Sequence, residues 1–137
     1  MIVVDASLAV KWLVIEASSD AAEQVLDAND IAAPDLIMIE VAGALVRRAN
    51  ETKALAAAMR AALVRWEGLL SDHLIDLFPP TPVALTRAGN LAIDLGHPVK
   101  DCLYLALAMD LDCPLVTADA RFAAKARGVY ADVRVLG

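Results

Sequence analysis

Short apolar, β-branched segments alternate along this chain with longer segments in which apolar residues recur every three or four positions. The short segments have the composition of buried strands, and the longer ones have the periodicity of amphipathic helices. Strands that alternate with helices favour a parallel sheet, because each helix carries the chain back across the sheet before the next strand begins. The alternation therefore predicts an α/β fold: a three-layer sandwich with a central, mostly parallel sheet of four or five strands and helices on both faces.

Turn and capping residues set the expected boundaries of these elements. Pro79, Pro80 and Pro82 end one strand, and Gly96 is expected to cap the end of a helix. The expected strands are 2–5, 31–33, 74–78, 114–117 and 133–136. The expected helices are 7–14, 19–28, 36–49, 53–70, 83–95, 99–111 and 119–127.

Length and composition predict one folded domain over residues 1–137. Hydrophobic residues make up 59% of the chain, and the 22% that are charged are spread along it rather than held in blocks, which argues against disorder. Charged residues interrupt every apolar stretch before it reaches the ~20 residues that a membrane span needs. The first residues have no basic leader before their apolar run, so we expect no secretory signal and a soluble protein.

The remaining bulk features favour a cytoplasmic protein and lower the expectation of nucleic-acid binding. Cys102 and Cys113 form neither a CxxC pair nor a zinc-finger spacing, and are expected to be buried thiols in a reducing compartment. His73 and His97 belong to no catalytic motif and are weak candidates. The net charge of −6 is unusual for a nucleic-acid protein, but acids that gather at one site and bind cations can reverse the local field.

Three aspartates stand at expected element boundaries, two of them after strands and one at the start of a helix. Asp5 closes the first strand, Asp119 follows the strand that ends at Thr117, and Asp101 opens a helix. The carboxyl ends of parallel strands share one edge of the sheet, which is where sites of α/β proteins form. Aspartate is also a common helix N-cap, so each residue taken alone has a structural explanation. Ser7 and Thr117, each two residues from an acid, could cap a helix or hold the acids in place.

Glu40 lies inside an expected helix, in the apolar segment IMIEVAGAL. A charge there costs desolvation energy unless it is paired or bound to a metal, and Arg47 and Arg48, seven and eight residues further on, are poorly spaced to pair with it. Four converging carboxylates repel one another and favour a hard cation such as Mg²⁺ or Mn²⁺. Because the chain has no nucleophile elbow or phosphate loop, the chemistry that fits is hydrolysis by metal-activated water.

These segments resemble the PIN-domain family, in particular the VapC-like toxins of toxin–antitoxin pairs. The resemblance runs through IVVDASLAVKWLVIE, IEVAGALVRRA and LGHPVKDCLYLALAMDLDCPLVTADARFAAKARG. It implies a Mg²⁺- or Mn²⁺-dependent endoribonuclease toxin, with Asp5, Glu40, Asp101 and Asp119 as catalytic metal ligands and Ser7 and Thr117 as supporting hydroxyls. It also implies an RNA substrate, a homodimer and a small VapB-like antitoxin that inhibits the enzyme.

The chain departs from the family pattern near two of the acids. Gly43 stands where many relatives have an asparagine, so a hydrogen bond from that side chain is missing. Lys100 and Cys102 flank Asp101 where an aromatic residue and an alanine are common. Lys11, Arg47, Lys100 and Arg121 are near the acids in sequence, and we expect some of them to contact RNA phosphates.

Two further interpretations and one surface remain open. An aspartate-based phosphatase or a receiver-like phosphoacceptor would also place an acid after an early strand, but the expected companion acids are missing. A catalytically silent PIN-fold interaction module would keep the fold without the activity. The stripe of Leu55, Met59, Leu63 and Trp66 on the helix 53–70 could be ordinary core, or a partly exposed surface for the second subunit or the antitoxin.

Overall fold

The computed structural model describes residues 1–136, so the predicted domain end at residue 137 lies outside the described residues. Within them the strands are β1 (Ile2–Val4), β2 (Ile31–Pro34), β3 (Ile75–Phe78), β4 (Leu115–Thr117) and β5 (Val133–Val135). The helices are α1 (Ala6–Ala9), α2 (Ser19–Ala28), α3 (Ile37–Glu51), α4 (Ala56–Ser71), α5 (Pro82–Leu95), α6 (Val99–Leu111) and α7 (Ala120–Ala126), with short 3₁₀ segments η1 (Val10–Trp12) and η2 (Lys53–Leu55).

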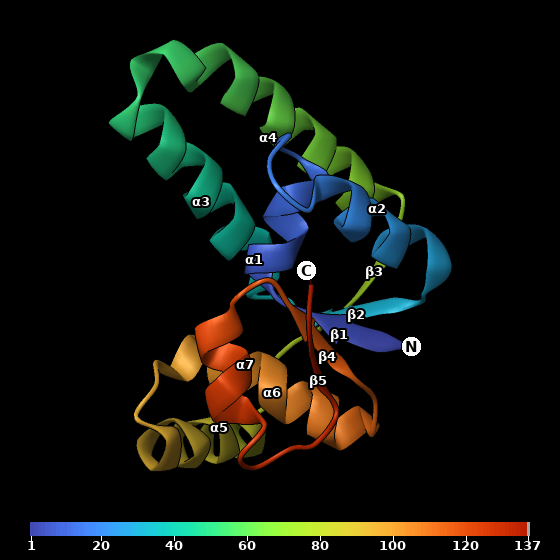
Figure 1. The fold of residues 1–137 in the computed structure, drawn as a ribbon, viewed down its shortest axis with the longest axis vertical. Coiled ribbons are helices and arrows are strands. Elements are labelled where there is room, and N and C mark those ends of the chain that lie inside the picture. Colours follow the sequence, from blue (N-terminus) through green and yellow to red (C-terminus); the bar gives the residue numbers. More distant parts are fainter. Residues whose placement is uncertain (137) are drawn as a thin grey trace.

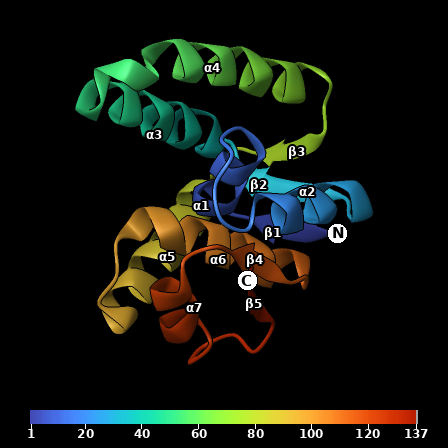
Figure 2. The ribbon, with the colours of Figure 1, turned by 45° about the horizontal axis from the view of Figure 1, so that its top comes forward.

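The strands form one parallel five-stranded sheet in the order β3-β2-β1-β4-β5 (Figure 1). From β1 the chain steps outward through β2 to β3, and then returns past both strands to place β4 on the other side of β1. Because crossovers between parallel strands are right-handed, reversing the direction of travel moves the helices to the opposite face. Figure 2 shows this result, with α1 to α4 on one face and α5 to α7 on the other. The predicted three-layer α/β fold is confirmed.

The chain adds β2 and β3 on one side of β1 and then adds β4 and β5 on its other side, so the strand order reverses between the adjacent strands β1 and β4. Val3 pairs with Leu115 and Val4 with Val116. The helices that follow these strands diverge, because α1 leaves toward one face and α7 toward the other. A parallel sheet opens a crevice at such a switch point, beyond the carboxyl ends of the strands. This position places the residues after β1 and β4 side by side.

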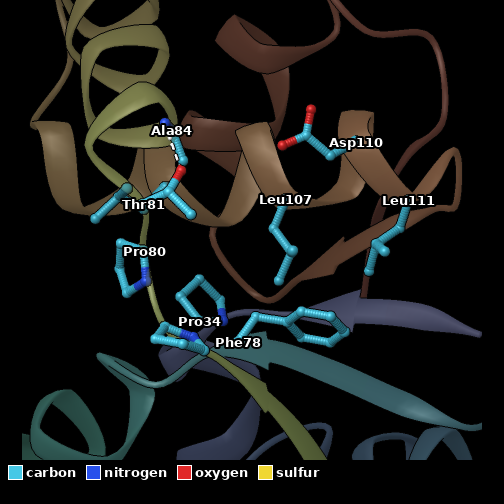
Figure 3. A pocket seen from close by; sticks show the side chains of 10 residues that line it. Pro34, Phe78, Pro80, Thr81, Ala84, Leu107, Asp110 and Leu111 are labelled. Carbon is cyan, nitrogen blue, oxygen red and sulfur yellow. Dashed lines mark hydrogen bonds between the residues drawn. The ribbon is translucent and has the colours of Figure 1, made fainter.

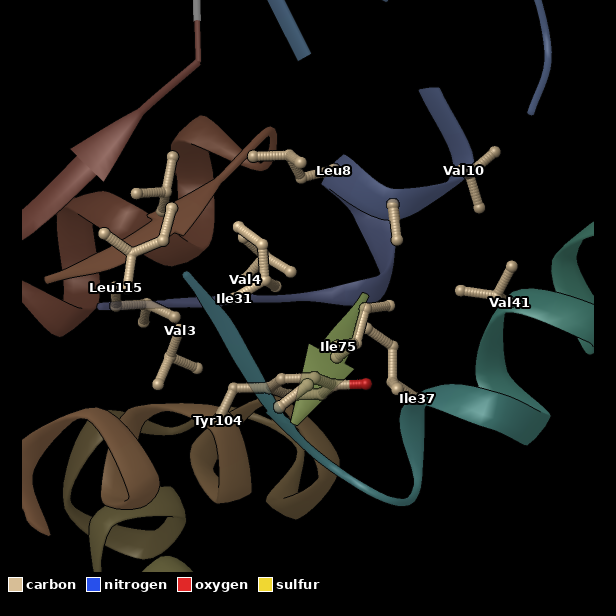
Figure 4. Packing of buried hydrophobic residues seen from close by; sticks show 14 of the residues in the cluster. Val3, Val4, Leu8, Val10, Ile31, Ile37, Val41, Ile75, Tyr104 and Leu115 are labelled. Carbon is tan, nitrogen blue, oxygen red and sulfur yellow. The ribbon is translucent and has the colours of Figure 1, made fainter. Parts of the chain in front are cut away.

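The core covers both faces of the central strands. Val3 and Val4 are fully buried and lie on opposite sides of β1, among Leu8, Leu115 and Tyr104 (Figure 4). A strand buried on both faces has no polar alternation, which explains the continuous apolar run at the start of the sequence. Cys102 and Cys113 are free and buried, as expected.

One sequence expectation needs correction, and one question that the sequence left open has an answer. The predicted helix 7–14 is a short α-helix, Ala6–Ala9, followed by the 3₁₀ turn Val10–Trp12, in which the Leu13 N–H donates to the Val10 carbonyl. The stripe of Leu55, Met59, Leu63 and Trp66 on the helix 53–70 is mostly core rather than partner surface, since Met59 is buried, although Leu55 is 40% exposed. Trp66 is only 3% exposed and its indole N–H donates to the Met38 carbonyl, so this face packs α4 against α3 within the same chain.

Replacing Trp66 with alanine is expected to lower the free energy of unfolding by about 3–5 kcal/mol, because it leaves a cavity between α3 and α4. Val64, on the same helix, is 68% exposed, so Val64→Ala should change stability by no more than about 0.5 kcal/mol. Urea unfolding of the two variants measures both values. Equal and small changes in the free energy of unfolding for the two variants would mean that packing of the Trp66 side chain does not stabilise the monomer.

Within residues 1–136, no helix combines the length and the apolar character that crossing a membrane requires.

Candidate active site

A groove of about 740 Å³ opens at the carboxyl ends of β1 and β4. Its walls come from α1, η1, α3, the start of α6 and the loop before α7, so it collects residues that are far apart in the sequence. Among the predicted acids and supporting hydroxyls, those that line it are Ser7, Glu40, Asp101 and Asp119. The fourth predicted acid, Asp5, lies behind Ser7 at the buried end of β1. The predicted acids therefore gather around one feature of the surface.

Asp5 is held by hydrogen bonds on both carboxylate oxygens. Ser7 Oγ donates to Asp5 Oδ1 over 2.7 Å, and the backbone N–H of Leu8 donates to the same oxygen over 3.2 Å. Thr117 Oγ1 donates to Oδ2. Asp5 thus caps α1, as its sequence position suggested, and also ties β1 to β4 through Thr117. Ser7 and Thr117 hold this acid, which is the supporting position expected of them.

The Asp5 carboxyl has an unusual pKa. Burial, with only 4% of the residue exposed, raises its pKa from 3.8 to about 6. The hydrogen bonds from Thr117, Ser7 and Leu8 oppose this rise, and the charge of Asp101 adds to it. A negative charge at this position is therefore costly to the metal-free protein, and a bound cation would relieve that cost.

Glu40 lies in the first turn of α3 and finds its partners on α6. Tyr104 donates its phenolic hydrogen to Glu40 Oε1 over 2.7 Å, and Lys100 Nζ lies 3.5 Å from Oε2. Figure 4 shows the Tyr104 hydroxyl pointing toward the start of α3, beside Ile37. Burial and the hydrogen bond to Glu40 raise the pKa of Tyr104 well above its ordinary value, so the phenol stays protonated. Among the residues that the structure describes, Glu40 forms no ion pair with Arg47 or Arg48, in keeping with their poor spacing.

Tyr104→Phe is expected to reduce the free energy of unfolding by about 1.5 kcal/mol or somewhat more, because a hydrogen bond to a charged acceptor is lost while the buried ring remains. In a Glu40→Gln background, Tyr104→Phe should reduce the free energy of unfolding by less, since the acceptor of the lost hydrogen bond is no longer charged. Chemical unfolding of the wild type, both single variants and the double variant gives the coupling energy. A coupling near zero would show that the two groups do not stabilise each other.

Asp101 and Asp119 present their carboxylates from two sides of the groove. Asp101 lies in the first turn of α6, and its Oδ2 is 2.5 Å from His97 Nε2. Asp119 caps α7 by accepting a hydrogen bond from the Phe122 N–H over 3.0 Å. The capping explanation therefore holds for Asp119, as it does for Asp5, but not for Asp101. Capping occupies one oxygen of Asp119, and this residue still lines the groove.

The donor set suits a hard divalent cation, since the four acids supply only oxygen atoms. Each acid is at present held by a protein partner: Asp5 by Ser7 and Thr117, and Glu40 by Tyr104. Among residues 1–136 no three acid, histidine or cysteine side chains already stand close enough to enclose a metal ion. The donor atoms thus fit Mg²⁺ or Mn²⁺ in their chemistry, and the carboxylates would have to turn toward an ion to coordinate it together.

Basic side chains share the groove with the acids. Lys11, Arg47 and Lys100 line it as predicted, whereas Arg121 is exposed on α7 and is not part of the lining. Arg48 takes a place there that the sequence did not suggest, and it pairs with Glu16 over 3.1 Å. Burial raises the pKa of Glu16, but the hydrogen bond and charge of Arg48 outweigh it and hold the pKa below its ordinary value.

Sequence reasoning missed two residues that contact the acids directly, His97 and Tyr104. His97 precedes Asp101 by four residues, but it lies before the start of α6 at Val99, so the helical spacing rule gave no signal for this contact. No local signal connects Tyr104 with Glu40, because they are 64 residues apart. Gly43, which replaces an asparagine common in the family, is exposed, and a Cβ there would meet no atom within 4 Å.

A second hollow, of about 220 Å³, has a different character. Pro34, Phe78 and Leu107 converge on it beside the start of α5 (Figure 3). Its one charged lining residue is Asp110, which pairs with Arg87. A pocket with this apolar lining lacks groups for hydrolysis, so the acidic groove is the better candidate for an active site.

Comparisons with known proteins agree with the fold. The model of the family described as PIN domain matches residues 2–128. Ribonuclease VapC9 from Mycobacterium tuberculosis is 35% identical over 121 residues, which cover 88% of this chain and 87% of that protein.

Solved structures give the same fold at lower identity. VapC20 from Mycobacterium tuberculosis, described as a sarcin-ricin loop cleaving toxin, aligns with a TM-score of 0.73 and 16% identity over 98% of this chain and 99% of that one. A chain of a toxin-antitoxin complex from Klebsiella pneumoniae aligns with a TM-score of 0.67 and 15% identity, over 100% of this chain and 98% of that one. At these identities the structural likeness concerns the fold alone.

Proposed function

This chain belongs to the PIN domain family, and from this premise we propose that it is a Mg²⁺- or Mn²⁺-dependent endoribonuclease toxin that cleaves RNA in the acidic groove. The observation that carries the proposal is the groove itself. It gathers Glu40, Asp101 and Asp119 in front of the buried Asp5, in a chain 35% identical to named VapC ribonucleases.

Each acid has a role that follows from its surroundings. Asp5, Glu40, Asp101 and Asp119 would hold the divalent ion, which when bound supplies Lewis acidity for activating water and for offsetting charge on the phosphodiester. Ser7 and Thr117 keep the Asp5 carboxylate oriented through their hydroxyl groups. Lys100, at the start of α6, forms an ion pair with Glu40 at the wall of the groove.

The basic residues of the groove are proposed to bind RNA phosphates. Arg47 is exposed, lines the groove and makes no ion pair within residues 1–136, so we expect Arg47→Ala to have the clearest effect. It should weaken RNA binding and reduce the slope of log affinity against log salt by about one. Arg121→Ala is the matched control because Arg121 is not part of the lining. Binding measured over a salt series tests the pair, and equal slopes for both variants would contradict the assignment.

A small VapB-like antitoxin is the proposed inhibitor, and the active protein is proposed to be a cytoplasmic homodimer. Support for the antitoxin is the likeness to a chain of a toxin-antitoxin complex over the whole of this sequence. The dimer remains a prediction from the family resemblance, and the cytoplasmic compartment remains a prediction from the cysteine content of the sequence. Light scattering of the purified protein tests the dimer directly.

Incubating the purified, partner-free protein with a panel of structured RNAs tests the function. Cleavage is expected with Mg²⁺ or Mn²⁺ and none with EDTA, and restoring the cation should restore cleavage. A catalytically silent PIN-fold module would cut none of the RNAs under any condition, which would refute the proposal. An acid-labile aspartyl phosphate on the protein would instead indicate phosphoacceptor chemistry.

A further inference from the structure

His97 occupies the junction between α5 and α6, next to the acidic groove. Gly96 ends α5 in the left-handed conformation, with φ of 61°, and the His97 N–H donates back to the Ala92 carbonyl over 3.0 Å. The imidazole stacks on the Phe122 ring of α7, with ring centroids 4.8 Å apart and planes inclined by 22°. Only 10% of the His97 side chain is exposed. Backbone and ring stacking together fix the direction of its nitrogen atoms.

The direction of the hydrogen bond follows from the partners. An ionised carboxylate can only accept, so His97 Nε2 carries the hydrogen and donates to Asp101 Oδ2 over 2.5 Å. Nδ1 of a neutral ring is then an acceptor, and Lys125 Nζ lies 3.5 Å from it while also donating to the Gly96 carbonyl over 3.0 Å. Lys125, His97 and Asp101 thus form a chain of donors leading toward the groove.

We propose that His97 is a positioning residue for Asp101: its N–H holds Oδ2 and turns the carboxylate so that Oδ1 faces the groove for a cation. Within residues 1–136, Oδ1 of Asp101 receives no hydrogen bond, so it is free for this role. The proposal rests on the proposed function, since it assigns a purpose to a contact of the same site. Partners that orient metal-binding carboxylates typically change affinity or activity by about 10–100-fold when they are removed.

A purely structural role, through the stack on Phe122, is the alternative, and two variants separate it from positioning. His97→Phe keeps an aromatic ring for Phe122 but has no N–H for Asp101. His97→Gln loses the ring but places an amide N–H at a similar distance from the backbone. His73 lies in a turn with φ of 56° and is not part of the groove lining, and His73→Asn is the matched control because asparagine tolerates that conformation.

The test is Mn²⁺ binding by the purified protein without RNA, measured from the electron paramagnetic resonance signal of free Mn²⁺, together with the melting temperature in EDTA. His97→Phe is expected to weaken Mn²⁺ binding by about 10-fold or more, with His97→Gln and His73→Asn close to the wild type. If His97→Phe does not fold, His97→Ala replaces it with the same expectation.

Three outcomes would overturn the proposal. Mn²⁺ binding by His97→Phe that matches the wild type, while Asp101→Asn binds more weakly, would refute positioning and leave the proposed function standing. Loss of affinity in both His97→Phe and His97→Gln, in step with a lower melting temperature, would assign His97 a structural role. A wild-type protein that binds no Mn²⁺ would refute the positioning role and the proposed function together.

Discussion

Asp101→Asn is expected to reduce RNA cleavage by at least about 100-fold. Removing a residue that supports a metal ligand typically lowers activity by about 10–100-fold, and loss of a residue proposed to bind the cation itself should lower it at least as far. The fold should survive. Asparagine keeps an oxygen that can accept the hydrogen bond from His97 Nε2, and the change removes a charge that opposes ionisation of Asp5. The free energy of unfolding in EDTA should therefore equal or exceed that of the wild type.

Cleavage rates with saturating Mg²⁺ and unfolding curves in EDTA test both halves of this expectation. Asp94→Asn is a suitable control, since Asp94 is exposed on α5 and is not part of the groove lining. A loss of several kcal/mol in stability would instead mean that Asp101 mainly holds the structure together. Full activity in the variant would remove Asp101 from the catalytic group.

Asp5→Asn is expected to stabilise the metal-free protein at neutral pH by up to about 3 kcal/mol. One pKa unit corresponds to about 1.36 kcal/mol, and the Asp5 pKa is raised from 3.8 to about 6 by burial. Asparagine can keep these hydrogen bonds. Its side-chain carbonyl can accept from the Leu8 N–H and the Ser7 hydroxyl, and its amide group can donate to Thr117 Oγ1, which reverses the direction of the bond that Thr117 donates to Asp5. RNA cleavage should nevertheless be lost, since this carboxylate is a proposed cation ligand.

The pH dependence of this effect has a definite sign. Between pH 3.8 and about 6 the folded protein binds a proton at Asp5 that the unfolded chain has released. The stabilisation from that proton is complete below pH 3.8 and is lost as the pH rises through about 6. The difference in unfolding free energy between Asp5→Asn and the wild type should therefore grow over this range and level off above it.

Unfolding in EDTA at several pH values measures that difference directly. Adding Mg²⁺ at neutral pH should then stabilise the wild type, by about 2.7 kcal/mol at 100 times the dissociation constant, and have much less effect on Asp5→Asn. A difference that stays flat with pH would mean that Asp5 titrates as an ordinary exposed carboxyl.

The layout of the fold was predictable because its signals are local. Alternating strand and helix patterns gave the layers, and Gly96 and the prolines near residue 80 gave boundaries close to those observed. The first helix was predicted too long because the tightening of its last turn depends on contacts elsewhere. Arg65 of α4 donates to the Leu13 carbonyl, and Trp12 donates to the Ala22 carbonyl of α2.

The site was predictable as a set of acids but not as a set of contacts. Asp5 and Asp119 follow neighbouring strands, so the sheet rule alone brings them together. The partners of Glu40 depend on how α6 packs against α3, which no spacing in the sequence encodes. The exposure of the α4 stripe could not be predicted for a similar reason, since the same helical pattern suits a buried core face and a partner interface. The structure decides between them because Trp66 is buried against α3.

The central claim is that Asp5, Glu40, Asp101 and Asp119 act on one divalent cation site. The most direct measurement is a crystal structure of the protein with Mn²⁺ bound, in which anomalous scattering locates the ion. The account predicts an anomalous peak in the acidic groove within coordination distance of oxygen atoms from these acids. A fully occupied Mn²⁺ ion elsewhere, or a groove that stays without a peak at saturating Mn²⁺, would contradict it.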